Sequence, residues 1–297
     1  MTEDFNSNLT AEEKRGHVFL IIRRIIAYII LIAMCLLCIF PFLTLLINMT
    51  KSHTELSQAF NMIPGTSFFK NFSRILGDKN IAVIRAMGNS LLIGALTCLI
   101  NVYVSSLTAY GLYAYEFKLK KAAYTFIMVI LMVPTQVSAL GYVQMVKGWG
   151  FENDNALPAL IFPAIAAPGV FFFIHQYMES ALPLEIVEAG RIDGGHEFYI
   201  FNFVVLPILK PAIAVQMIFS FVASWNNYFL PQLLMQANSK TATLPLMVAA
   251  LNASANDNFD LGKVYMVLGL AIVPLIIVYL CLSKYIIRGI ALGSVKG

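Results

Sequence analysis

Long uncharged apolar runs, separated by polar segments, dominate the pattern of hydrophobic and polar positions along this 297-residue chain. A helix needs about 20 predominantly apolar residues to cross the hydrocarbon core of a bilayer, and the runs reach that length. The pattern therefore predicts an all-α membrane protein with six transmembrane helices. We expect these spans at 25–47, 86–115, 122–146, 157–178, 204–234 and 264–283.

Prolines lie within or at the ends of several predicted spans. In a membrane bundle, neighbouring helices and polar side chains can satisfy the carbonyl groups that a proline leaves unpaired. We therefore expect kinked helices rather than interrupted ones. The positions are Pro41, Pro134, Pro163, Pro168, Pro207, Pro211 and Pro274.

The composition supports a chain whose main surroundings are a lipid bilayer. Only 12% of the residues are charged, about half the share of an ordinary soluble domain. The net charge of +4 does not indicate a nucleic-acid partner, because basic residues at the cytoplasmic ends of membrane helices give the same excess. We expect no nucleic acid among its partners.

The positions of the basic residues predict that both termini are cytoplasmic. Four basic residues precede the first span, and segment 116–121 carries three lysines, whereas segment 147–155 carries one lysine beside two acidic residues. Cytoplasmic loops are enriched in Lys and Arg. The predicted organisation is a cytoplasmic segment 1–24, a six-helix domain 25–286 with a cytoplasmic loop at about 179–207, and a cytoplasmic tail 287–297.

Motifs for chemistry within the chain are missing. No Gly-x4-Gly-Lys-Ser/Thr sequence is present to cradle nucleotide phosphates. The histidines are dispersed, and the four cysteines lie in apolar runs, where they act as small apolar residues. We expect no catalytic residue, metal site or cofactor here. An ion-coupled secondary transporter is a less favoured alternative, because the spans hold essentially no carboxylate to titrate.

The hydrophilic stretch 179–207 predicts a short helix joined directly to the fifth span. Pro183 suits the first helical position, where its missing N–H would be unpaired anyway. Glu188 and Arg191 are three residues apart and can pair on one face. Gly194 and the glycine after it can end the helix and turn the chain. The residues alone leave open whether a partner docks on this helix or whether it is a solvated linker.

The same stretch resembles the integral-membrane subunits of binding-protein-dependent ABC importers. That family carries Glu-Ala-Ala, three residues, Gly, nine residues, Ile, one residue and Leu-Pro. This chain keeps the spacing, with Gly190 for the second Ala and Val204 for the Ile. The resemblance implies a type I permease fold whose loop helix docks on a separate ATPase. It assigns coupling to Glu188, Ala189, Gly190, Asp193, Gly194, Leu206 and Pro207.

Segments 191–194, 224–226, 243–246 and 288–297 also resemble the smaller permease of maltose-type oligosaccharide importers. This resemblance implies a carbohydrate, an oligosaccharide, carried by alternating access across the plasma membrane of a prokaryote. It implies a homologous second permease, two cytoplasmic ATPase subunits that bind ATP and Mg, and an extracellular sugar-binding protein. A permease for a polyamine or an amino acid is the alternative within the family.

Two groups of residues are candidates for the solute path. Polar residues recur at helical spacing on one face of the second span, where they could bind sugar hydroxyls or pack between helices. An aromatic and amide cluster in the fifth span could stack on a sugar ring or anchor the interface. The candidates are Asn101, Ser105, Trp225, Asn226 and Tyr228, with Thr97 and Thr108 on the same face as Asn101.

Overall fold

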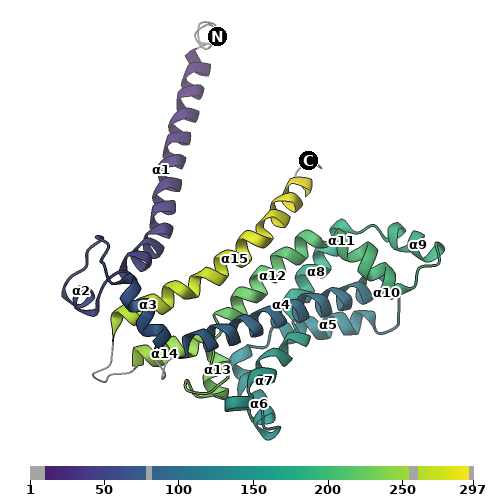
Figure 1. The fold of residues 1–297 in the computed structure, drawn as a ribbon. Coiled ribbons are helices and arrows are strands. Elements are labelled where there is room, and N and C mark those ends of the chain that lie inside the picture. The colour runs from purple at the N-terminus through teal and green to yellow at the C-terminus, as the bar shows by residue number, and fades with distance from the viewer. Residues whose placement is uncertain (1–10, 78–81, 254–259, 294–297) are drawn as a thin grey trace.

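The computed structural model describes residues 11–77, 82–253 and 260–293, and every helical or extended element within these ranges is a helix (Figure 1). This confirms the predicted all-α class. In chain order the elements are α1 (Ala11–Asn48), α2 (His53–Gln58), α3 (Phe68–Gly77), α4 (Val83–Ala114), α5 (Lys120–Leu131), α6 (Thr135–Gly148), η1 (Asn153–Asn155), α7 (Leu157–Ile161), η2 (Phe162–Ile165), α8 (Pro168–Ala181), α9 (Leu184–Ile192), α10 (Glu197–Ile200), η3 (Phe201–Val205), α11 (Leu206–Ile208), α12 (Lys210–Trp225), α13 (Phe229–Leu234), α14 (Leu244–Ala253) and α15 (Leu261–Gly293).

Four stretches of the described chain are long and apolar enough to cross a membrane as single spans: Phe19–Asn48, Val83–Ala114, Leu157–Ala181 and Leu261–Ser283. Two bent pairs of helices bring the number to six if each pair is one crossing. The six predicted spans therefore each have a counterpart. The first helix begins at Ala11, well before the predicted start of the first span.

The sequence predicted one continuous helix for the third span, but the structure divides it into two. It is broken between α5 and α6, whose axes are bent by 95°. Pro134 is the N-cap of α6 and has an extended backbone. A proline removes one helical N–H and disfavours helical geometry in the residue before it. The proline expected to kink this span thus turns it through a right angle.

The fifth predicted span, 204–234, is also divided. The segment α10–η3–α11 meets α12 at 83°, and α13 is separate from α12. Pro207 and Pro211 flank the bend and donate no backbone hydrogen bond that could carry the helix through it. The two arms of this bent pair are long and apolar enough for a membrane crossing only when they are taken together.

Helix α4 lies at the centre of the bundle and packs against α8 and α12, whereas α1 stands apart from the other helices in Figure 1. The apolar window of α1 has no buried residue within the chain. Its C-terminal end joins the body where the side chain of Met49 lies directly against Gly269 of α15. No larger residue fits at position 269 without displacing Met49.

A buried apolar cluster ties the loop between the fourth and fifth crossings to the bundle. It joins Tyr110 of α4, Ile174 of α8, Val187 of α9, and Phe201 and Val205 of η3. All five side chains are buried. The loop helix is therefore packed on the membrane helices rather than tethered loosely to them.

Candidate coupling loop and polar cleft

Helix α9 is short, and contacts on its inner face hold it in place. A nine-residue helix is only marginally stable alone in water, so tertiary packing must stabilise it. Val187 supplies that packing and is fully buried, whereas Ile192 is 86% exposed. Pro183 occupies the N-cap position, one residue before the position expected for it. In Figure 1, α9 lies at one extremity of the molecule.

The C-terminal end of α9 is a Schellman motif. Gly194 has a φ of +82°, and its N–H donates to the carbonyl of Arg191 at 3.1 Å. The N–H of Gly195 donates to the carbonyl of Gly190 at 3.0 Å. This confirms that the glycines end the helix and turn the chain. It also gives a physical reason for glycine at position 194, since the left-handed region is unfavourable for other residues.

The expected pair between Glu188 and Arg191 is wrong. Arg191 Nε donates to Glu197 Oε1 at 2.6 Å, and its Nη2 donates to the carbonyl of Ala114 at 3.4 Å. The guanidinium also lies 5.1 Å from the centre of the Tyr115 ring. Arg191 thus turns inward to the end of α4, while Glu188 stays exposed. Spacing along α9 indicated Glu188 as a possible partner, but the turn after α9 brings Glu197 of α10 to Arg191 instead.

Glu197 accepts hydrogen bonds from two elements. Arg191 binds one carboxylate oxygen, and the hydroxyl of Tyr110 donates to the other at 2.7 Å. The hydrogen bond from Arg191 is the main cause that lowers the pKa of Glu197 to about 2. The carboxylate is therefore ionised at every physiological pH. We call these five residues the latch: Tyr110, Ala114 and Tyr115 of α4 and its end, with Arg191 and Glu197 of the loop.

The coupling residues expected from the sequence fall into two sets. Glu188, Ala189, Asp193 and Gly194 are exposed on α9 and its C-terminal turn, where a partner could reach them. The others have inward or remote positions. They are Gly190, whose Cα lies against Ile200, and Leu206 and Pro207, which lie on α11 before the bend into α12.

A cleft of about 450 Å³ opens between α4, α12 and the segment around α7–α8. We call it the polar cleft because six of its fifteen lining residues carry hydroxyl or amide groups, while the other nine are apolar. Gln216, Ser220 and Ser224 follow one another at four-residue spacing on α12, facing Thr97 and Asn101 of α4. No residue that lines this cleft in the described chain is acidic or basic. The cleft therefore offers hydroxyl and amide groups without a fixed charge.

Two buried polar atoms at the cleft lack a partner among the described residues. They are Thr97 Oγ1 and Asn101 Oδ1. Buried polar atoms are normally hydrogen-bonded, so an unpaired one points to water, a ligand or another chain. The cleft shares Pro163, Ala167 and Asn227 with a pocket of about 830 Å³ at the bend between α5 and α6. The two hollows adjoin, and α4 lines only the polar cleft.

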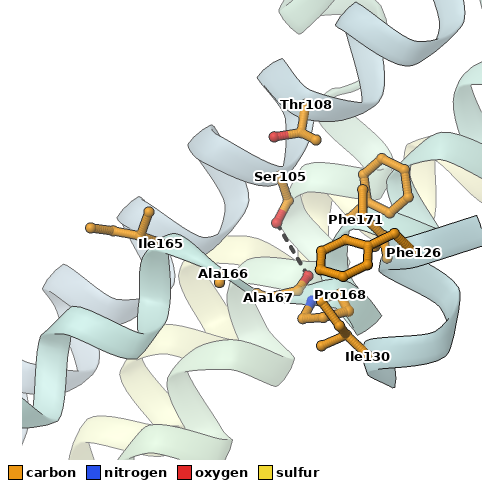
Figure 2. A pocket seen from close by; sticks show the side chains of 10 residues that line it. Ser105, Thr108, Phe126, Ile130, Ile165, Ala166, Ala167, Pro168 and Phe171 are labelled. Carbon is orange, nitrogen blue, oxygen red and sulfur yellow. Dashed lines mark hydrogen bonds between the residues drawn. The ribbon is translucent and has the colours of Figure 1, made fainter. Parts of the chain in front are cut away.

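The structure separates the five residues expected to line the solute path. Asn101 lies in the polar cleft. Ser105 lies in a different pocket of about 260 Å³, between Thr108, Phe126 and Phe171, and its hydroxyl donates to the carbonyl of Ala167 at 3.4 Å (Figure 2).

The other three line a third pocket, of about 320 Å³, between the end of α12, α14 and α15. They are Trp225, Asn226 and Tyr228. Trp225 is buried and its ring is stacked on Phe221 with centroids 5.8 Å apart, so it packs the core. The sequence interpretation overlooked Gln216, Ser220 and Asn227. The four-residue spacing of polar side chains on α12 was the signal for the first two.

The fold is a bundle of membrane-spanning helices with a polar cleft, and its loop helix is packed on one face and exposed on the other. This combination is typical of the permease class of transport proteins. Residues 101–292 match the family described as the binding-protein-dependent transport system inner membrane component, and the chain belongs to this family. This confirms the resemblance carried by the loop. It also makes the chain a transport subunit of an ABC importer.

Similar proteins span nearly the whole chain. The arabinooligosaccharides transport system permease protein of Bacillus subtilis is 30% identical over 280 residues, which cover 92% of this chain and 96% of that protein. The trehalose/maltose transport system permease protein of Thermococcus litoralis is 29% identical over 281 residues, covering 93% and 98%.

The fold is shared with a solved transporter. A chain in the crystal structure of a bacterial ABC transporter involved in the import of the acidic polysaccharide alginate matches with a TM-score of 0.77. The match covers 94% of this chain and 99% of that chain at 20% identity. It confirms the type I permease fold expected from the sequence.

Proposed function

We propose that this chain carries a neutral oligosaccharide across the plasma membrane of a prokaryote, as one permease of an ABC importer that works by alternating access. The observation that carries the proposal is the uncharged polar cleft between α4 and α12. A sugar hydroxyl loses hydrogen bonds to water on entering such a site and needs replacements there. Amides such as those of Asn101 and Gln216 can both donate and accept.

The absence of charge in the lining argues against the other solutes. A polyamine or an amino acid needs opposite charges when it leaves water, and the described lining has none. The same reasoning favours a neutral sugar over an acidic one such as alginate. The two relatives are named for the transport of arabinooligosaccharides and of trehalose/maltose, which supports this choice.

The exposed face of α9 is the proposed docking site for an ATPase subunit. Leu184 and Ile186 are 40% and 39% exposed and Ile192 is 86% exposed, beside the carboxylates of Glu188 and Asp193. An apolar centre with a polar rim is typical of protein interfaces. ATP and Mg would be bound by two such subunits, and this chain would contribute no nucleotide site.

The remaining partners follow from the family and the topology. A binding-protein-dependent importer needs an external protein to deliver the sugar, and we propose a homologous second permease to complete the path. With the N-terminus in the cytoplasm, six crossings return the C-terminus to the same side. The loop with α9 then lies in the cytoplasm too, because it falls between the fourth and fifth crossings.

Uptake by the reconstituted complex tests the substrate class. The complex of both permeases, the ATPase subunits and the binding protein is placed in proteoliposomes with ATP inside. Labelled arabinotriose, maltotriose and raffinose are offered against alginate trisaccharide, spermidine and an amino acid mixture. Neutral oligosaccharides alone should be taken up. Transport of spermidine or an amino acid would refute the sugar assignment and leave the family membership intact.

A further inference from the structure

A movement of α9 can reach the membrane helices by two routes. The first route follows the backbone, which can deform at several points between α9 and α12. From α9 the chain passes through the turn at Gly194, the π-helical segment η3 and the 83° bend before α12. Short π-helical segments and sharp bends are where helices deform and where functional hinges occur. Deformation of the turn, of η3 and of the bend would absorb part of a displacement of α9 before it reached α12.

The second route runs through the side-chain contacts of the latch and reaches α4, a helix without a break. Tyr110, Ala114 and Tyr115 sit at the end of α4, which is one continuous helix of 32 residues. Asn101 lies nine residues before Tyr110, about 14 Å along the same helix. The helix that holds the latch thus also carries one wall of the polar cleft.

The contacts of the latch fix the orientation of the Arg191 and Glu197 side chains as well as the distance between them. Glu197 is held on both carboxylate oxygens, at 2.6 Å and 2.7 Å, so its plane cannot turn freely. Arg191 is held by Glu197, by the Ala114 carbonyl and by the face of the Tyr115 ring. Hydrogen bonds that involve an ionised group are shorter, stronger and more directional than apolar contacts.

We propose that the latch transmits the movement of α9 to α4, and so to the cleft wall at Thr97 and Asn101. This inference rests on the proposed function as an ATPase-driven importer. Arg191, Glu197 and Tyr110 are positioning residues in this scheme. The buried contact of Val187 keeps α9 on the bundle, and the charged hydrogen bonds of the latch add a directional link between α9 and the end of α4.

The latch can be weakened without unfolding the loop. The side chains of Arg191 and Glu197 are 34% and 40% exposed, so a partner left alone can be hydrated. The test variants are Glu197→Gln, which keeps the shape and removes the charge, and Tyr110→Phe. The control is Glu116→Gln, which breaks the neighbouring ion pair with Lys120 at 2.7 Å outside the latch.

Sugar uptake and ATP hydrolysis are measured together in proteoliposomes. Glu197→Gln should lower the sugar transported per ATP about tenfold, equivalent to ~1.4 kcal/mol of coupling. Tyr110→Phe should lower it by a smaller factor, and Glu116→Gln should leave it unchanged. Binding of the ATPase subunits should be normal in all three. A wild-type ratio in both latch variants, or lost ATPase binding, would overturn the proposal.

A second measurement does not depend on the transported sugar. Spin labels at Glu185, an exposed residue of α9 that the proposed docking face does not include, and at Leu107 of α4, which is 39% exposed, report the distance between the two helices. With the latch intact, this distance should stay narrow and unchanged when ATP and vanadate trap the complex. It should broaden in Glu197→Gln. A wild-type distance that changes on trapping would overturn the proposal, even if neutral sugars prove not to be the substrate.

Discussion

Replacing Gly194 by alanine isolates a single physical effect at the coupling loop. Gly194 has a φ of +82°, and a Cβ built on it meets no atom within 4 Å. The substitution therefore adds no clash, and its cost is the left-handed backbone of a non-glycine residue. That cost is about 1–2 kcal/mol, which shifts the equilibrium constant between the closed and the open motif by roughly 5–30-fold.

The expected consequence is a frayed end of α9. Without the Schellman motif, the bonds from the N–H groups of Gly194 and Gly195 to α9 are lost, and the exposed face loses its shape. The affinity of the ATPase subunit for the permease should then fall, by at most roughly 5–30-fold, since it follows the fraction of closed motif. The assay is equilibrium binding of the purified ATPase to the permease complex in lipid nanodiscs.

Two matched variants make the reasoning refutable. Gly194→Asn should bind the ATPase more tightly than Gly194→Ala, because asparagine visits the left-handed region more readily. Gly77→Ala, at the end of α3, also meets no neighbouring atom and has no positive φ, so it should change nothing. Equal affinities for Gly194→Ala and the wild type would refute the argument. So would an asparagine variant as weak as the alanine variant, since the effect would then not follow backbone preference.

Three further results are expected. Asn101→Ala should raise the KM of oligosaccharide uptake about fivefold, since a lost hydrogen bond costs ~1 kcal/mol, while Leu99→Ala on the exposed side of α4 should not. Gly269→Ala should lower the melting temperature of the purified complex because of overpacking against Met49, at a cost of about 1–3 kcal/mol. In a Met49→Ala background the same glycine substitution should cost less, and an equal loss of stability in both backgrounds would contradict the packing. A reporter active only outside the cell should be inactive when fused after Gly297 and active between α14 and α15; the reverse would overturn the orientation.

The parts of this protein that depend on neighbours along the chain could be predicted from the sequence. Apolar runs located four continuous spans and the two bent pairs of helices, because the length needed to cross a bilayer is a property of one segment. The end of α9 at Gly194 was predicted as well, since a helix terminates through local backbone geometry. The spaced Glu-Ala and Leu-Pro motif indicated the family, because the whole motif lies within one continuous segment of the chain.

The parts that depend on contacts between helices were decided by the tertiary structure. Arg191 has Glu188 one turn away, yet it pairs with Glu197 and the end of α4. Asn101 and Ser105 share a face of α4 but open into different pockets, and Trp225 packs inward on Phe221. Sequence spacing determines which residues share a face of one helix. The rotation and tilt of each helix against the next determine what that face meets, and these are set by packing of the whole bundle.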